Sequence, residues 1–151
     1  MIYKECKLDL FSVPNDYYLV QCISADFGMG KGIAVEFNNR FDMKNKLKKK
    51  YQSFVDRWDY NESLANNIGY CLLEDRVFNL ITKRNYWLKP TYGTLRTSLE
   101  LMKDIMVDKN ITKIAMPVIG CGLDRLQWNK VSEIIKDIFK DTDSEILVCI
   151  K

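Results

Sequence analysis

The stretch Met116-Pro-Val-Ile-Gly-Cys-Gly-Leu-Asp-Arg-Leu-Gln-Trp128 joins an apolar strand to a helix through a loop with two glycines. Gly120 and Gly122 permit backbone angles and close approaches that a residue with a Cβ does not. Such a turn can aim successive N–H groups at one point, which suits an anionic ligand. The loop also carries the carboxylate of Asp124 at the carboxyl end of a buried strand, where open α/β sheets bind ligands. The stretch therefore predicts an α/β sheet with a ligand site at this edge.

A second glycine loop, Ser24-Ala-Asp-Phe-Gly-Met-Gly-Lys-Gly32, follows the apolar strand predicted at residues 17–23 and leads into an amphipathic helix. It is not a Walker A loop, because a glycine follows Gly30-Lys31 where that motif needs serine or threonine. It is not a dinucleotide fingerprint either, because Ile33 takes the place of the last glycine. Alone, the loop is either a tight turn or a ligand loop. Two loops of the same design can converge on a diphosphate from both sides.

Apolar runs and helical spacings predict the other elements. Strands are expected at residues 2–7, 69–73, 77–81, 114–118 and 146–150, and helices continue past Phe41 across residues 44–58, begin near Thr91, and cover residues 131–139. Strands that alternate with helices and are apolar along most of their length indicate a layered α/β fold with a mixed, largely parallel sheet. No repeat or linker divides the chain, so we predict a single domain over residues 1–151.

The composition is that of an ordinary globular protein, with 47% hydrophobic and 28% charged residues in a chain of 151. The net charge of +3 is too small to indicate a nucleic-acid binder and fits a phosphate-bearing ligand equally well. Five cysteines without a C-x-x-C pair favour a reducing compartment. There is no apolar signal core at the start and no apolar run of membrane-spanning length. We expect a monomer in the cytoplasm, or in the nucleus if eukaryotic, that is neither secreted nor bound to membranes.

The chain has no histidine. A Ser-His-Asp or Cys-His arrangement is therefore excluded, and so is a zinc site with histidine ligands. If the protein is an enzyme, its acids, bases and nucleophiles come from Asp, Glu, Lys, Cys, Tyr, Ser or Thr.

Two residues stand out as candidates for chemistry, each with a plainer alternative. Lys83 follows the apolar strand at residues 77–81, and is either a solvated lysine at a strand end or an amine that attacks a sugar carbonyl and forms a Schiff base. Asp124 either holds backbone N–H groups at the start of a helix or acts as a general acid and base.

Two further features also leave alternatives open. The run at residues 44–50 has five lysines, which is typical of a solvated helix face and alternatively fits a contact to nucleic acid or an acidic protein. Tyr86-Trp87 flank a bound ring, form a lid over the site, or pack at the rim of the sheet.

With these residues in view, the chain resembles the macrodomain family, and within it the branch typified by terminal ADP-ribose protein glycohydrolase. The resemblance covers nearly the whole chain and rests on Asp9-Leu-Phe11, Gln21-Cys-Ile-Ser24, Met29-Gly-Lys-Gly-Ile-Ala-Val35, Leu80-Ile-Thr-Lys83, Lys89-Pro-Thr-Tyr92 and residues 116–128. It implies a three-layer α/β/α fold that binds ADP-ribose across the ends of its sheet, with no metal and no cofactor.

The resemblance also implies roles for individual residues. Asp9 would contact the adenine amino group, Lys83 would attack the anomeric carbon of the distal ribose, and Asp124 would assist proton transfer and release of the adduct. Further contacts to ADP-ribose are implied for Leu10, Ser24, Gly30, Gly32, Ile33, Thr91, Ile119, Gly120, Cys121, Gly122 and Leu123.

The function that the resemblance implies is an ADP-ribosyl hydrolase. It would remove mono-ADP-ribose from glutamate or aspartate side chains of proteins through a covalent lysyl intermediate, and would also deacylate O-acyl-ADP-ribose. The alternatives are a hydrolase of ADP-ribosylated DNA bases of the antitoxin type, a reader that binds ADP-ribose without turnover, and an ADP-ribose-1″-phosphate phosphatase. Lys31 and the aromatic run Asn85-Tyr-Trp-Leu88 differ from the corresponding residues of the better-known member of this branch. Both lie where the modified target would enter, so they affect which leaving group the site accepts.

Overall fold

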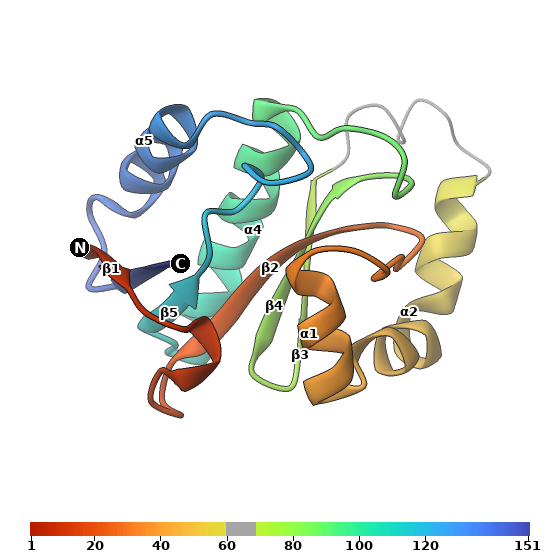
Figure 1. The fold of residues 1–151 in the computed structure, drawn as a ribbon, viewed down its shortest axis with the longest axis horizontal. Coiled ribbons are helices and arrows are strands. Elements are labelled where there is room, and N and C mark those ends of the chain that lie inside the picture. The colour runs from red at the N-terminus through yellow and green to blue at the C-terminus, as the bar shows by residue number, and fades with distance from the viewer. Residues whose placement is uncertain (60–68) are drawn as a thin grey trace.

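The computed structural model describes residues 1–59 and 69–151, and the side chains at 52–59 lie outside that description. Figure 1 shows strands and helices that alternate along most of the chain. The elements are β1 (Ile2–Lys7), η1 (Leu10–Ser12), β2 (Tyr18–Ser24), α1 (Ile33–Phe41), α2 (Met43–Asp59), β3 (Tyr70–Glu74), β4 (Val77–Lys83), α4 (Tyr92–Lys109), β5 (Lys113–Met116), α5 (Trp128–Phe139) and β6 (Glu145–Ile150).

The strands form a six-stranded sheet in the order β1-β6-β5-β2-β4-β3. Neighbouring strands are parallel except for β3, which pairs antiparallel with β4. The turn between these two strands uses a positive φ of 52° at Asp75, as tight hairpins require. The prediction of a mixed, largely parallel sheet is confirmed. Because five strands run parallel, the chain segments that leave their carboxyl ends all emerge at one edge.

Helices cover both faces of the sheet. On β2, Leu19 and Ile23 pack with α1 and α2, whereas Val20 points to the other face and packs with α4 and α5. Such alternation is what a strand buried on both faces requires. The predicted three-layer α/β/α architecture is therefore confirmed. Within the two described ranges, none of the helices has the length and apolar character needed to cross a bilayer.

A buried pair of amides crosses the middle of the sheet. Gln21 on β2 donates from Nε2 to Asn79 Oδ1 on β4 at 2.8 Å, and both residues are fully buried. Asn79 in turn donates to the backbone carbonyls of Leu72, at 3.1 Å, and Val77, at 3.3 Å. Buried polar groups of this kind have to find partners, so they fix the register of β2, β4 and β3 against one another.

The helix expected to continue past Phe41 is instead broken. Asp42 has a left-handed backbone, with φ 51° and ψ 40°, and α2 begins at the next residue. Asn38 Oδ1 accepts the backbone N–H of Lys44 at 3.0 Å, which stabilises the new helix start. A second irregularity, at Tyr51, kinks α2 itself. The prediction of one continuous helix was wrong because no glycine or proline marks the break, and aspartate tolerates the left-handed region.

Candidate functional site

Lys83 and Asp124 meet at the carboxyl edge of the sheet. Lys83 is the last residue of β4, and Asp124 lies in the loop between β5 and α5. Lys83 Nζ donates to Asp124 Oδ1 at 2.6 Å, with only 12% and 13% of the two side chains exposed. The lysine is therefore not a solvated strand-end residue. Asp124 is not the cap of α5 either, because Gln127 holds that position.

The two glycine loops face each other beside this pair. Gly32 has a positive φ of 64° and starts α1, and a Cβ built on it would lie 3.8 Å from Leu123 Cδ1 of the second loop. Gly30 and Gly122 border open space, because a Cβ built on either would meet no atom within 4 Å. Packing within the protein therefore does not require glycine at these two positions. A ligand that lies directly against the backbone would require it.

The second loop is a series of tight turns. Gly120 has a positive φ of 74°, and its carbonyl accepts the N–H of Leu126 at 2.7 Å. Arg125 also has a positive φ, of 62°, and donates its N–H to the carbonyl of Gly122 at 3.2 Å. These turns fold the loop back on itself, so that Asp124 points to Lys83 while Leu123 stays 60% exposed.

Asp26 connects the first loop to the segment that follows Lys83. Its carboxylate accepts from the hydroxyl of Ser24, from the N–H of Gly28 at 3.0 Å, and from the N–H of Tyr86 at 3.1 Å. No sequence pattern predicts a functional role for this residue. An aspartate two residues before a glycine is a typical local turn former, so the hydrogen bond to Gly28 could have been predicted from the sequence. The hydrogen bond to Tyr86 spans 60 positions, so no local pattern could have predicted it.

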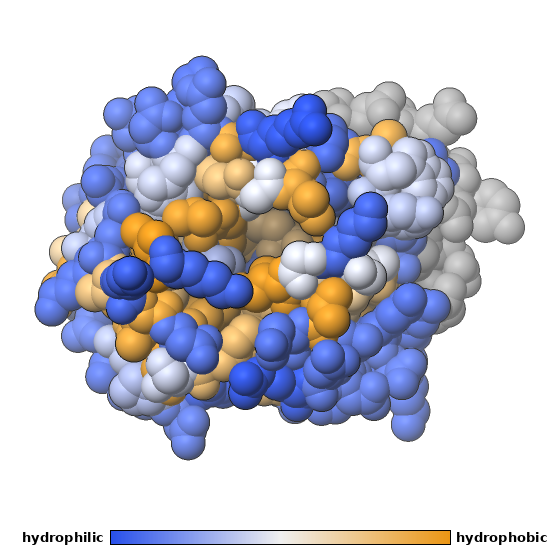
Figure 2. Space-filling view, viewed as in Figure 1, coloured by the Kyte–Doolittle hydropathy of each residue, from blue (hydrophilic) through white to orange (hydrophobic). Residues whose placement is uncertain are grey.

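A hollow lies among these loops. Figure 2 shows it on the same face as Figure 1, with apolar side chains along its border and long hydrophilic side chains reaching over the rim. In Figure 1 this region lies where the chain leaves β2 and β5. The site therefore combines a surface depression, two glycine loops and a partly buried amine–carboxylate pair.

The fold is shared with known macrodomains. No protein-family model matches the chain. The macrodomain of Mycobacterium tuberculosis DarG superposes with a TM-score of 0.76 and 20% identity, over 98% of this chain and 97% of that one. A structure of Thermosipho africanus DarTG in complex with ADP-ribose gives a TM-score of 0.72 and 16% identity, over 99% of this chain and 42% of that one.

A sequence relative decides the family. The chain is 42% identical over 146 residues to the ADP-ribose glycohydrolase OARD1 of Bos taurus, which covers 94% of this chain and 87% of that protein. The chain is a macrodomain of the OARD1 family. The resemblance inferred from the sequence blocks is thereby confirmed.

The contacts to ADP-ribose expected for this macrodomain fall into two groups. Leu10, Ser24 and Ile119 are 4%, 1% and 2% exposed, so they form a first group that is buried inside the protein. Thr91 caps α4, where its hydroxyl accepts the N–H of Thr94 at 3.0 Å. The second group is exposed or half-buried and consists of Asp9, Gly30, Gly32, Ile33, Thr91, Gly120, Cys121, Gly122 and Leu123. Ligand contact by each of these residues stays a prediction.

Two cysteines near the pair are poor nucleophiles. Burial raises the pKa of Cys22, and the nearby carboxylate of Asp124 raises it further. Burial also raises the pKa of Cys121, in the second glycine loop. Both thiols are therefore protonated near neutral pH, and the thiolate is the reactive form.

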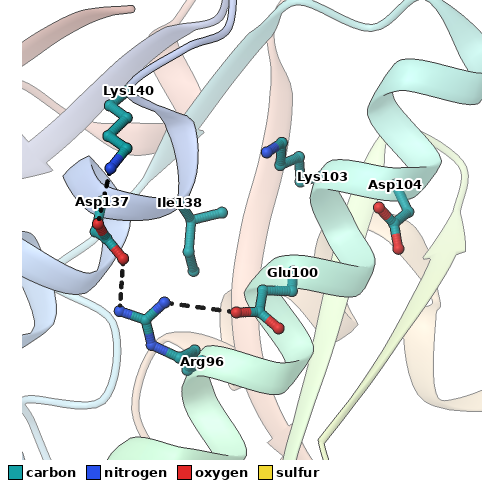
Figure 3. Close-up of a pocket in the computed structure, with 7 residues that line it drawn as sticks. All are labelled: Arg96, Glu100, Lys103, Asp104, Asp137, Ile138 and Lys140. Carbon is teal, nitrogen blue, oxygen red and sulfur yellow. Dashed lines mark hydrogen bonds and ion pairs between the residues drawn. The ribbon is translucent and has the colours of Figure 1, made fainter.

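A groove between α4 and α5 has a different character (Figure 3). Arg96 bridges to Asp137 at 2.9 Å and to Glu100 at 3.5 Å, and Lys140 lies 3.6 Å from Asp137. The hydrogen bond from Arg96 lowers the pKa of Asp137. The charges that line this groove neutralise one another, so we interpret them as ion pairs that join two helices of the macrodomain.

Proposed function

We propose that this macrodomain is a hydrolase that releases mono-ADP-ribose from acidic side chains of proteins, through a covalent intermediate on Lys83. The observation that carries the proposal is the partly buried contact of 2.6 Å between Lys83 Nζ and Asp124 Oδ1. A reader that only binds ADP-ribose needs neither group. Support comes from the bovine relative, which is named an ADP-ribose glycohydrolase, and from the structure of Thermosipho africanus DarTG in complex with ADP-ribose.

In the proposed substrate, the anomeric carbon of the distal ribose is bonded to an oxygen of a glutamate or aspartate side chain. The neutral amine of Lys83 would attack this carbon. The new C–N bond forms as the C–O bond breaks, and the side chain leaves as a carboxylate with the electron pair. Asp124 is within hydrogen-bond distance of the amine, so it can accept the proton that the lysine must lose.

The second step would return the enzyme to its starting state. Water adds its oxygen to the anomeric carbon as the bond to the lysine breaks, and Asp124 returns its proton to the departing amine. The proton that the water loses balances the carboxylate released in the first step. The products are free ADP-ribose and the unmodified acidic side chain. The balance is one ester and one water consumed for one carboxylic acid and one ADP-ribose formed.

Binding far from the bond that breaks would position the sugar. The loops around Gly30 and Gly122 offer backbone N–H groups and open space to a diphosphate. Asp9, at the end of β1, would hold the adenine. Binding energy from these remote groups is what places the anomeric carbon within reach of the amine.

The test uses a peptide that is mono-ADP-ribosylated on one glutamate, with ADP-ribose release followed by mass spectrometry. We expect release by the wild type and none by Lys83→Ala. In Asp124→Ala we expect release to slow by ~10²–10⁴-fold, the usual contribution of a general acid or base, while an ADP-ribosyl adduct accumulates on the lysine. Lys103→Ala, which changes a lysine on α4, is the matched control and should release ADP-ribose normally.

Two results would contradict the proposal. Release by Lys83→Ala at the wild-type rate would remove the lysyl intermediate. Tight binding of ADP-ribose by the wild type without any release would leave a reader, or an enzyme for a different linkage such as an ADP-ribosylated DNA base.

A further inference from the structure

The segment that follows Lys83 is fixed at both ends across the site. We call residues 84–89 the strap. On one side, the N–H of Tyr86 donates to Asp26 at 3.1 Å. On the other side, Lys89 Nζ donates to the carbonyl of Leu123, in the second glycine loop, at 2.7 Å. The strap therefore runs from one glycine loop to the other.

A close backbone approach fixes the strap further. A Cβ built on Gly28 would lie 3.1 Å from Tyr86 Cβ, closer than nearly all real contacts of that kind. Glycine thus allows the first loop to pack directly against the strap. Within the strap, the N–H of Leu88 donates to the carbonyl of Asn85 at 3.0 Å and closes a turn. The strap is held from both sides and from within.

Three neighbouring side chains that the strap presents to solvent, those of Tyr86, Trp87 and Leu88, are aromatic or apolar. Tyr86 and Trp87 are 64% and 63% exposed, with ring centroids 5.0 Å apart and planes at 88°. Leu88 is 40% exposed, and Leu123 beside the strap is 60% exposed. An apolar cluster that stays in water on a well-anchored segment is typical of a binding surface.

The order of the strands places this cluster on the leaving-group side. Asp9 follows β1 at one end of the sheet, and Lys83 ends β4 near the other, with β6, β5 and β2 between them. An ADP-ribose that extends from Asp9 to Lys83 fills the edge over these strands. The leaving group, which is bonded to the anomeric carbon, then lies past Lys83, where the strap continues.

We propose that the strap determines substrate specificity, with Tyr86 and Trp87 binding an apolar or aromatic side chain next to the modified acidic residue of a protein. This inference rests on the proposed function. A protein side chain fits the cluster better than a nucleic-acid strand does. Rings at 88° offer no parallel platform for successive bases, and Lys89 is already bonded to Leu123.

Asp26 is the positioning residue of the strap. Its replacement by asparagine leaves one oxygen to accept from Ser24 and Gly28, but turns an NH₂ group toward the N–H of Tyr86. The first glycine loop then keeps its bonds while the bond to the strap is lost. Asp26→Asn therefore changes how the strap is held while it leaves the hydrogen bonds of the first glycine loop, where ADP-ribose is expected to bind, in place.

The experiment compares two glutamate-modified peptides that differ only in having phenylalanine or glycine beside the modified residue. Affinities are measured on Lys83→Ala, which forms no adduct, and kcat/KM on the wild type. We expect a preference of about tenfold for the phenylalanine peptide in both measurements, the usual range for one apolar group. The paired change Tyr86→Ala and Trp87→Ala, and separately Asp26→Asn, should abolish the preference with the affinity for free ADP-ribose within about twofold. Val107→Ala, at a 68% exposed apolar residue on α4, is the control and should keep it.

The outcomes separate this inference from the proposed function. Equal affinity for the two peptides in Lys83→Ala overturns the inference, whatever the turnover. A preference in binding without release by the wild type supports the strap and refutes the hydrolase. Tighter binding of an ADP-ribosylated oligonucleotide than of either peptide, lost when Tyr86 and Trp87 are changed, overturns the inference in favour of nucleic acid.

Discussion

Gly30 and Gly122 offer a way to detect ligand contact without a bound ligand. Since a Cβ at either position would meet no protein atom within 4 Å, Gly30→Ala and Gly122→Ala should leave the melting temperature unchanged. If the diphosphate lies against these backbones, a methyl group there removes close contacts. We expect the affinity for ADP-ribose to fall by at least about tenfold in calorimetric titrations.

Gly120 is the control for this pair because its role is conformational. Its φ of 74° is strained for alanine, and a Cβ would approach Leu126 Cδ1 to 2.9 Å. Gly120→Ala should therefore lower the free energy of unfolding by roughly 1–2 kcal/mol, even without ligand. Unchanged ADP-ribose affinity in both Gly30→Ala and Gly122→Ala would show that the loops do not bind the diphosphate.

Single residues show how far sequence reasoning reaches at the site. The local pattern left Lys83 open between a solvated lysine and a nucleophile, and only the resemblance paired it with Asp124. The contact of 2.6 Å joins a strand end and a loop residue 41 positions apart, which no local rule predicts. Asp26 was missed for the same physical reason, because its partner Tyr86 belongs to a distant segment.

At the scale of elements, Gly69 is where α4 packs closest to the chain that enters β3. A Cβ there would meet the carbonyl of Thr94, and would lie 2.7 Å from Thr97 Cβ and 2.9 Å from the N of Ser98. Since two of these atoms belong to the helix backbone, they cannot move aside cheaply. Gly69→Ala should lower the free energy of unfolding by roughly 1–3 kcal/mol, the usual cost of overpacking, as measured by urea denaturation.

Gly93, inside α4, is the matched control for this prediction. A Cβ there would lie at an ordinary 3.6 Å from Thr91 Oγ1. Alanine also favours the helix over glycine, so Gly93→Ala should leave stability unchanged or raise it by up to ~1 kcal/mol. A loss in Gly93→Ala equal to that in Gly69→Ala would mean that the contact with α4 is not the cause.

The helices and strands themselves were largely predictable from the sequence, and the break that was missed has a physical cause. β1 and β6 follow from apolar patterns, and the start of α4 follows from Thr91 and the proline before it. The break at Asp42 did not follow, because its signal is a side chain that tolerates a left-handed backbone. Breaks of this kind are selected by the tertiary packing of α1 and α2, which a single sequence does not display.

At the scale of the whole molecule, the parallel sheet explains why distant segments make one site. Asp9, the two glycine loops and the strap leave four different strands, yet all emerge at the same edge. The core below is continuous on both faces of the sheet, so the edge is a rigid base for the loops. The sequence predicted that loops would gather at the carboxyl edge of a largely parallel sheet. It did not predict which hydrogen bonds join those loops.

Four buried or half-buried thiols make the stability of the whole domain sensitive to alkaline pH. Burial raises the pKa of Cys22, Cys71 and Cys121, and raises that of Cys149 from 9.0 to about 11. Above about pH 9 the unfolded chain loses these thiol protons while the folded chain keeps them, so the unfolded state binds fewer protons. The stabilisation is therefore complete below the unfolded pKa and declines as the pH rises towards the folded values.

We expect the free energy of unfolding, from urea titrations, to fall by at least about 1 kcal/mol between about pH 8 and about pH 10.5. The raised pKa of Lys113, which donates to Asp16, acts in the same direction. Cys149→Ala isolates the thiol contribution, because it removes one titrating group and should flatten the decline even though its cavity lowers stability at every pH. An identical pH dependence in the wild type and Cys149→Ala would mean that the thiol is already solvated in the native protein, and that the packing of β6 against β1 is looser than the structure describes.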